Sequence, residues 1–139
     1  MDWSPISKPS GSLPREPNLV DYDAARRQFT WDMARAQLDR LPGGGLNIAH
    51  EAVFRHLAGP QADQVAIRFL AQGQPDVERT YRELALDARR FASVLRRLGV
   101  ARGDCVASLL GRVPPLYTAV LGTLAAGSVY CPLFSAFGP

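Results

Sequence analysis

The sequence predicts an α/β fold in which helices precede a parallel βαβ unit. The first observation is a long segment, residues 80–98, whose apolar side chains recur every three or four residues, as on one face of a helix. The second is a pair of short β-prone runs, residues 105–110 and 129–134, with a helical segment at 116–126 between them. This order predicts a parallel pair of strands with a right-handed crossover. Because both strands are almost wholly apolar, we expect them and the helix to be covered on most sides.

The amino-terminal stretch predicts an arm followed by one helix. Residues 1–20 carry four prolines among serines, a composition that is typical of an extended chain. Helical spacing then begins, with Asp21 or Asp23 as the cap. Pro42 and the glycines at 43–45 end this segment as a linker, because a phosphate-binding loop needs a preceding strand and a following lysine. The apolar positions of the predicted helix are Tyr22, Ala25, Phe29, Met33 and Ala36.

The middle of the chain predicts a short helix and a β-hairpin. Asn47 is placed to cap the helix, and Gly59 with Pro60 closes it. The β-prone runs at 65–71 and 77–81 are joined by a turn that contains Gly, Pro and Asp, so we expect them to pair as a hairpin with a longer loop.

The helix at 80–98 is the element with the clearest signals. Thr80 and Glu83 have the spacing of a capping box, and Gly99 ends the helix. The arginine doublets at 89–90 and 96–97 allow two interpretations, a basic stripe for phosphate or nucleic acid and a solvated helix face. We favour the solvated face, because acidic residues interleave and no aromatic platform accompanies the arginines. The stripe expected to be buried is Tyr81, Leu84, Ala88, Phe91, Leu95 and Leu98.

The titratable residues predict neither a catalytic constellation nor a metal site. His50 and His56 fall on different faces of their helix, so we expect packing or surface roles for them. Cys105 and Cys131 lie in apolar runs without CxxC spacing, which predicts two buried thiols. We expect cap and turn roles for the aspartates at four positions, Asp63, Asp76, Asp87 and Asp104.

Composition excludes several classes of partner. The chain has 139 residues, 47% of them hydrophobic, enough for one globular domain. Its net charge of +3 comes from 16 basic and 13 acidic residues that are interspersed, so no nucleic-acid partner is indicated. The first residues lack the apolar core of a signal peptide, which favours a cytoplasmic location. The uncharged run at 113–139 is long enough to span a bilayer, but prolines and glycines divide it, so we expect no membrane partner.

Several short motifs follow one another in a specific order. They are Gly-Gly-Gly-Leu-Asn-Ile-Ala at 43–49, Arg55-His56, Thr-Tyr-Arg-Glu-Leu at 80–84, the helix end at 95–100, Arg-Gly-Asp-Cys-Val at 102–106, Gly-Ser-Val at 127–129 and Pro-Leu-Phe-Ser-Ala-Phe at 132–137. In this order they resemble the AMP-forming acyl-CoA synthetase (adenylate-forming ligase) family, and its acetyl-CoA synthetase branch in particular. The resemblance implies an extended Pro/Ser-rich arm at 1–20 and, at 21–139, the incomplete start of the large amino-terminal adenylate-forming domain.

The resemblance implies a ligase that works through an acyl-adenylate. Such enzymes join acetate, or another small carboxylic acid, to ATP with release of pyrophosphate, and then pass the acyl group to CoA; ATP, CoA and Mg²⁺ are thus implied for the full-length parent. In the family, the lysines and the flexible loop that handle the triphosphate lie downstream, and the only lysine here is Lys8. We therefore expect a fragment of an acetate–CoA ligase that carries no catalytic residue, holds no cofactor, is inactive alone and has the missing remainder of the ligase as its partner.

One binding stretch is implied. In acetyl-CoA synthetases the residues after the last strand approach the CoA nucleotide, and Ser135 and Ala136 occupy those positions here. The family often has glycines there, and a simple strand-end turn is the alternative. Since sheets of this kind bind ligands at the carboxyl ends of their strands, we expect the turns after Leu110 and Phe134 to face the nucleotide and CoA region.

A second function is compatible with the same sequence, namely a short noncatalytic partner or decoy that docks on a full-length ligase. Both hypotheses share one physical expectation. The chain ends five residues after its last predicted strand, so the far side of the sheet would be uncovered. Exposed apolar surface and unpaired strand edges predict that the isolated chain is poorly soluble or partly molten.

Overall fold

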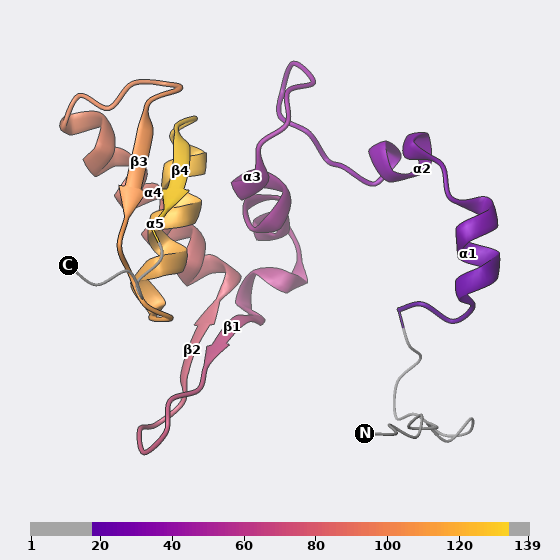
Figure 1. Ribbon diagram of the computed structural model, residues 1–139, viewed down its shortest axis with the longest axis horizontal. Coiled ribbons are helices and arrows are strands. Elements are labelled where there is room, and N and C mark those ends of the chain that lie inside the picture. Colours follow the sequence, from indigo (N-terminus) through magenta and orange to yellow (C-terminus); the bar gives the residue numbers. More distant parts are fainter. Residues whose placement is uncertain (1–17, 134–139) are drawn as a thin grey trace, which may run out of the picture. The chain divides into compact units, whose positions relative to one another are not determined.

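The computed structural model (Figure 1) describes residues 18–133 and contains both helices and strands, including one parallel pair. The chain divides into two compact units, Met1–Gln37 and Leu38–Pro139. The predicted α/β class is confirmed. The proposed domain boundary between residues 20 and 21 stays a prediction.

The first unit contains two short helices where the spacing predicted one. They are α1 (Tyr22–Gln28) and α2 (Trp31–Ala36), and neither buries a residue. Phe29 adopts extended backbone, and the side-chain oxygen of Thr30 accepts a hydrogen bond from the Met33 N–H at 3.2 Å. A β-branched hydroxyl residue that caps the next turn offers the backbone an alternative to continuing the helix, so the prediction of a single helix was wrong.

The second unit begins with a loop and a helical segment. Asn47 caps α3 as predicted, because its side-chain oxygen accepts from the His50 N–H at 3.2 Å. The Asn47 amide also donates to the Leu124 carbonyl at 2.7 Å, which ties this segment to a helix far along the chain. Two 3₁₀ turns follow, and Pro60 starts the second of them. The bounds are α3 Ile48–Ala52, η1 Phe54–Ala58 and η2 Pro60–Asp63.

The hairpin and the long helix follow as predicted. Strands β1 (Val65–Phe69) and β2 (Val77–Thr80) pair antiparallel and lead directly into α4 (Tyr81–Arg97). The Thr80 hydroxyl accepts from the Glu83 N–H at 3.2 Å, and the Glu83 carboxylate accepts from the Thr80 N–H at 2.9 Å. Both halves of the predicted capping box are therefore present.

The carboxyl end of α4 shows why a glycine stands there. Gly99 has a φ of 83°, in the left-handed region that side chains with a Cβ disfavour. This conformation lets the Val100 N–H bond the Leu95 carbonyl at 3.0 Å and the Gly99 N–H bond the Arg96 carbonyl at 3.1 Å. The pair of bonds is a Schellman motif, so the predicted helix stop is confirmed.

The predicted βαβ unit is also confirmed. It consists of β3 (Cys105–Ser108), α5 (Pro114–Ala125) and β4 (Val129–Pro132), and the two strands are parallel neighbours. Figure 1 shows the β3 and β4 arrows side by side and pointing the same way. Strand β3 ends two residues earlier than predicted. Both prolines of the 113–115 turn lie in the first turn of α5, where a missing N–H costs no helix hydrogen bond.

The core of the second unit is made by helices. Helix α5 crosses α4 so closely that a Cβ added to Gly122 would lie 2.8 Å from the Ala88 carbonyl oxygen and 2.8 Å from the Phe91 Cβ. Small residues on both helices permit this approach, because each removes atoms that would hold the backbones apart. The buried residues of the cluster are Ala49, Val53, Leu84, Ala85, Ala88 and Leu121.

The β3–β4 pair is less covered than its composition predicted. Cys105 is exposed, Cys131 is half-buried and Val129 is 54% exposed, so the thiols of this chain are not buried as predicted, and one face of the strand pair is uncovered, as the order of elements led us to expect. Side chains alternate between the two faces of a strand. Val106 and Tyr130 lie on the half-buried face of the pair, whereas the cysteines lie on the opposite, open face.

Within the part of the chain that the structure describes, no helix is both long enough and apolar enough to cross a bilayer.

Candidate functional site

The carboxyl edge of the β3–β4 pair is the candidate site, because open parallel sheets bind ligands where their strands end. The two strands end at Ser108 and Pro132, directly opposite each other in the register. The Leu133 N–H continues the pairing by donating to the Ser108 carbonyl at 2.8 Å. Both strands therefore end at the same edge of the pair; that the turns after Leu110 and Phe134 face the nucleotide and CoA region stays a prediction.

Two hydroxyl groups lie beside this edge. The Ser108 and Tyr130 side chains hydrogen-bond to each other on the half-buried face, and either hydroxyl can be the donor. The hydroxyl that donates in this bond keeps its oxygen free to accept, and the hydroxyl that accepts keeps its O–H free to donate. The pair can therefore orient a polar ligand group. The sequence interpretation did not single them out. The signal available in the sequence was one hydroxyl side chain on each of two otherwise apolar strands.

Ser135 and Ala136, the predicted CoA-binding positions, lie outside the described residues. They follow Leu133 by two and three positions, so the chain leads to them from the carboxyl edge. Their role stays a prediction. The turn at 109–113 that follows β3 is described, and it bends back into α5 with the Val113 N–H donating to the Gly111 carbonyl at 2.9 Å.

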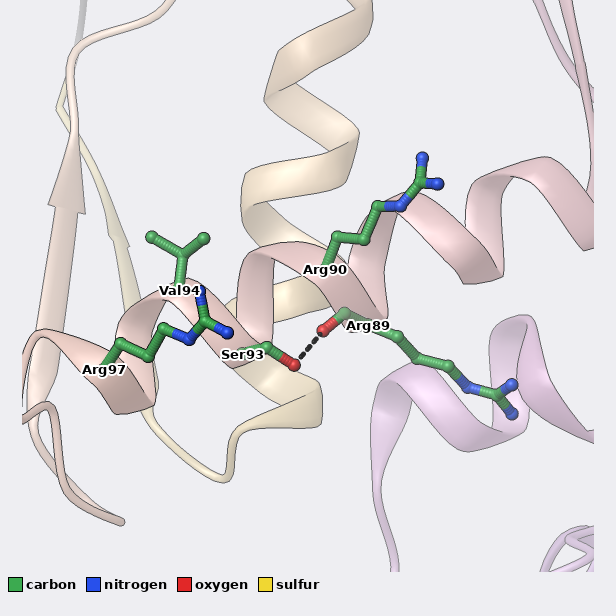
Figure 2. A pocket seen from close by; sticks show the side chains of 5 residues that line it. All are labelled: Arg89, Arg90, Ser93, Val94 and Arg97. Atoms are coloured by element: carbon green, nitrogen blue, oxygen red, sulfur yellow. Dashed lines mark hydrogen bonds between the residues drawn. The ribbon is translucent and has the colours of Figure 1, made fainter.

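The arginine doublets of α4 do not converge on a common point. A hollow of about 370 Å³ lies beside them. Figure 2 shows the Arg89 and Arg90 side chains extending in different directions. The Arg89 guanidinium lies over the Phe54 ring, 5.1 Å from its centroid, a cation–π contact. Both doublets are exposed, which agrees with the solvated helix face favoured above. The hollow is lined by Arg89, Arg90, Ser93, Val94 and Arg97.

The two histidines have separate structural partners. His50 Nε2 lies 2.8 Å from Asp39 Oδ2, and His56 Nδ1 lies 2.8 Å from Gln61 Oε1. The His56 ring also packs against Tyr81, with ring centroids 5.0 Å apart. The predicted packing and surface roles are confirmed. Across residues 18–133, no group of three or more His, Cys, Asp or Glu side chains is placed to hold a metal ion.

The carboxylates with shifted pKa values stabilise turns and caps. Asp63 accepts from Arg82 Nε at 2.7 Å and from Arg82 Nη2 at 3.0 Å, and this paired hydrogen bond lowers the pKa of Asp63. Hydrogen bonds from Thr80 lower the pKa of Glu83. A carboxylate stabilised in its charged form is a poor general acid or base at neutral pH, so these groups are structural.

Glu51 stabilises the loop before α3. Its carboxylate accepts from the Arg40 N–H at 2.7 Å, from the Asp39 N–H at 3.0 Å and from Arg55 Nη1 at 2.8 Å. Partial desolvation acts to raise the pKa of Glu51, but these hydrogen bonds outweigh it and the net shift is downward. The loop includes Arg40 at a φ of 66°, a conformation that the two backbone bonds to Glu51 help to stabilise.

The fold and the strand-end edge define a class of protein, and comparison with known families names it. Residues 54–139, more than half of the chain, match the family model described as AMP-binding enzyme. The chain belongs to this family of AMP-binding enzymes.

Curated relatives are acetyl-coenzyme A synthetases. That of Bacillus subtilis (strain 168) is 35% identical over 121 residues, which cover 86% of this chain and 21% of the relative. That of Syntrophus aciditrophicus (strain SB) is 40% identical over 100 residues, which cover 70% of this chain and 15% of the relative. The chain thus spans at most about a fifth of the length of these relatives.

Solved structures give the same result. The chain matches the Brucella canis acyl-CoA synthetase with a TM-score of 0.75 and 36% identity, covering 85% of this chain and 21% of that one. It matches the acetoacetyl-CoA synthetase of Streptomyces lividans with a TM-score of 0.61 and 30% identity, covering 71% and 16%. The resemblance to AMP-forming acyl-CoA synthetases inferred from the motifs is confirmed.

Proposed function

We propose that this chain is the first part of an AMP-forming acetate–CoA ligase. In the complete enzyme, acetate and ATP would form acetyl-adenylate and pyrophosphate, and the CoA thiol would then displace AMP to give acetyl-CoA. The observation that carries the proposal is the likeness to an acetyl-coenzyme A synthetase over 86% of the chain. We also propose a cytoplasmic location for the enzyme.

The described residues do not fit a triphosphate or a Mg²⁺ site. No cluster of three or more potential metal ligands occurs in residues 18–133, and the single lysine of the chain is Lys8. Charge stabilisation of a transferring nucleotide needs cations or oriented donors at the reacting phosphate. We therefore assign ATP and Mg²⁺ binding to the remainder of the ligase and derive no chemical step from this chain.

The contribution that we propose for this chain is positional. The α4–α5 packing supports the β3–β4 pair, and the pair directs the residues after Leu133 from the carboxyl edge. We propose that Ser135 and Ala136 approach the CoA nucleotide there. Small side chains suit this role, because they allow backbone groups to come close to a ligand.

Complementation tests the proposal. The 139-residue chain would be co-expressed with a segment of the Bacillus subtilis relative that begins where the matched region ends, and acetate-dependent exchange of pyrophosphate into ATP would be measured. We expect activity from the two pieces together and none from either alone. Exchange by the chain alone would contradict the proposal.

The CoA assignment has its own variant. Ala136→Asp places a charge where we propose that the CoA nucleotide approaches, so the KM for CoA should rise at least about tenfold through lost contact and repulsion of phosphate. Exchange of pyrophosphate into ATP needs no CoA and should stay unchanged, which serves as the internal control. An unchanged KM for CoA would exclude this assignment.

The alternative, a noncatalytic partner that docks on a full-length ligase, gives a different result in the same assay. Adding the chain to the intact Bacillus subtilis relative would then change its exchange rate in proportion to the amount added. We expect no such change, because the acetate–CoA ligase proposal gives the chain a place only within one folded enzyme.

A further inference from the structure

One carboxylate holds the start of the loop that leads into α3, named here the entry loop (residues 38–46). Glu51 Oε2 accepts the Asp39 N–H at 3.0 Å, and Glu51 Oε1 accepts the Arg40 N–H at 2.7 Å. Arg55 Nη1 also donates to Glu51 Oε2, at 2.8 Å. Hydrogen bonds to an ionised acceptor are stronger than those between neutral groups. This carboxylate therefore fixes two backbone groups that lie eleven and twelve positions before it in the sequence.

The entry loop is also closed on itself and attached just after its end. The Gly44 N–H donates to the Leu41 carbonyl at 2.9 Å, and the Leu41 N–H donates to the Gly45 carbonyl at 2.8 Å. The Asn47 amide then donates to the Leu124 carbonyl of α5 at 2.7 Å. In Figure 1 the turn is a narrow projection next to the start of α3. The loop thus has one fixed point before its turn and another after it.

The closed loop is strained at a residue that Glu51 holds. Arg40 has a φ of 66°, in the left-handed region that side chains with a Cβ disfavour. The N–H of the same residue makes the shorter of the two backbone bonds to Glu51. The bond and the strained conformation are therefore formed and released together. Because the strain offsets part of what the hydrogen bonds contribute, the closed and open loops are closer in free energy than those bonds alone would make them.

This contact lies where the chain enters its second unit. The division into compact units falls between Gln37 and Leu38, so the entry loop is the first part of the second unit. We propose that Glu51 is a latch that controls the length of free chain between the two units. With the latch closed, the chain is fixed to α3 at Asp39; with the latch open, the entry loop becomes a tether while α4 and α5 stay folded. Nine extended residues span about 30 Å, so opening changes how far the first unit can reach.

Amide hydrogen exchange of the 139-residue chain, read at single residues by mass spectrometry, tests the latch. In Glu51→Gln the protection of the Asp39 and Arg40 amides should fall at least about tenfold, because both lose an ionised acceptor. Glu78→Gln is the matched control. It makes the same change at an exposed carboxylate of β2, which accepts from Arg68 Nε at 2.7 Å, and it should leave both amides as they are in the parent chain.

The pH dependence separates the latch from other contacts at the same place. Partial desolvation acts to raise the pKa of Glu51, but its hydrogen bonds outweigh this effect and the net shift is downward. The charge of Glu51 therefore holds the loop above the ordinary glutamate pKa, and this contribution is lost as the pH falls through the lowered pKa. Protection of the Asp39 and Arg40 amides should fall over this window in the parent chain and not in Glu51→Gln. The other charged groups there, which are Arg40, Arg55 and His50 paired with Asp39, are the same in both chains.

Two results would overturn the proposal. Unchanged protection of the Asp39 and Arg40 amides in Glu51→Gln would show that the carboxylate does not hold the loop. An equal loss of protection at Leu84 and Ala88, in the core of α4, would show that the loop opens only when the whole unit unfolds. In the expected result, the α4 amides keep the protection that they have in the parent chain.

Discussion

The α4–α5 contact and the β3–β4 pair belong to the same unit of the chain but are built differently. At the helix contact, the missing Cβ of Gly122 lets the backbones of α4 and α5 approach each other, and Ala88 is fully buried there. At the strand pair, four residues on each side share backbone hydrogen bonds while the open face exposes Val129 and Cys105. Burial of apolar area is the main stabilising term in folding, so we assign most of the stability of this unit to the helices.

The comparison also concerns function. The helix contact at Gly122, Ala88 and Phe91 is made of apolar side chains and backbone, whereas the strand pair carries the hydroxyl pair and the carboxyl edge. A site placed on an element that others support keeps its geometry without contributing much stability itself. This division predicts that substitutions will differ in cost according to the region in which they fall.

Gly122→Ala should have the largest effect. The added methyl would meet a backbone oxygen of Ala88 and the Phe91 side chain at 2.8 Å, and helix backbone cannot give way cheaply. Overpacking of this kind costs about 1–3 kcal/mol or more, while the gain in helix propensity is about 1 kcal/mol. We expect a net loss of about 2 kcal/mol in the free energy of unfolding, measured by urea denaturation.

Gly111→Ala is the control for that substitution. Nothing lies within 4 Å of a Cβ built at Gly111, and its φ is outside the left-handed region. We expect a change within about 0.5 kcal/mol, as for most surface substitutions. Equal effects of the two alanines would show that the close helix contact does not limit stability.

Thr80→Ala should have an intermediate effect. It removes the hydroxyl that accepts the Glu83 N–H, and loss of an N-cap costs about 1 kcal/mol. The measurement is the same urea denaturation, with Ser93→Ala, on the exposed face in the middle of the same helix, as the control. If Ser93→Ala cost as much as Thr80→Ala, the cap would have no special role.

The cap should also respond to pH. Because Thr80 lowers the pKa of Glu83 in the folded chain, the carboxylate contributes stability above the ordinary glutamate pKa. That contribution is lost as the pH falls through the lowered pKa. Glu83→Gln should therefore flatten the decline of stability in this acidic window, and stability profiles of equal slope would contradict the assigned hydrogen bond.

Local signals in the sequence were sufficient to predict the helix caps, the helix ends and the order of the elements. The capping box at Thr80, the glycine stop at Gly99 and the βαβ unit each depend on residues that are close in sequence or on an unbroken pattern. The break at Thr30 was missed because a cap hydrogen bond competes locally with helical spacing.

Other features depend on contacts between distant segments, which no single-sequence pattern contains. The role of Gly122 becomes visible only when Phe91 is packed against it. The register of the β3–β4 pair, which places Cys105 and Cys131 on the same face, joins residues far apart in the sequence. The same limit applies to the hydroxyl pair of the candidate site.

Val129→Thr should have the smallest effect and tests the open face directly. The substitution keeps the side-chain shape and the β-branched character that suits a strand, and Val129 is 54% exposed. Its cost in the free energy of unfolding should stay within about 0.5 kcal/mol at low protein concentration. If two chains instead bury their open faces against each other, the hydroxyl would enter a dry interface and the cost would grow with concentration. Urea denaturation at two protein concentrations a hundredfold apart separates these cases, because only an associated face makes the midpoint of the parent chain depend on concentration.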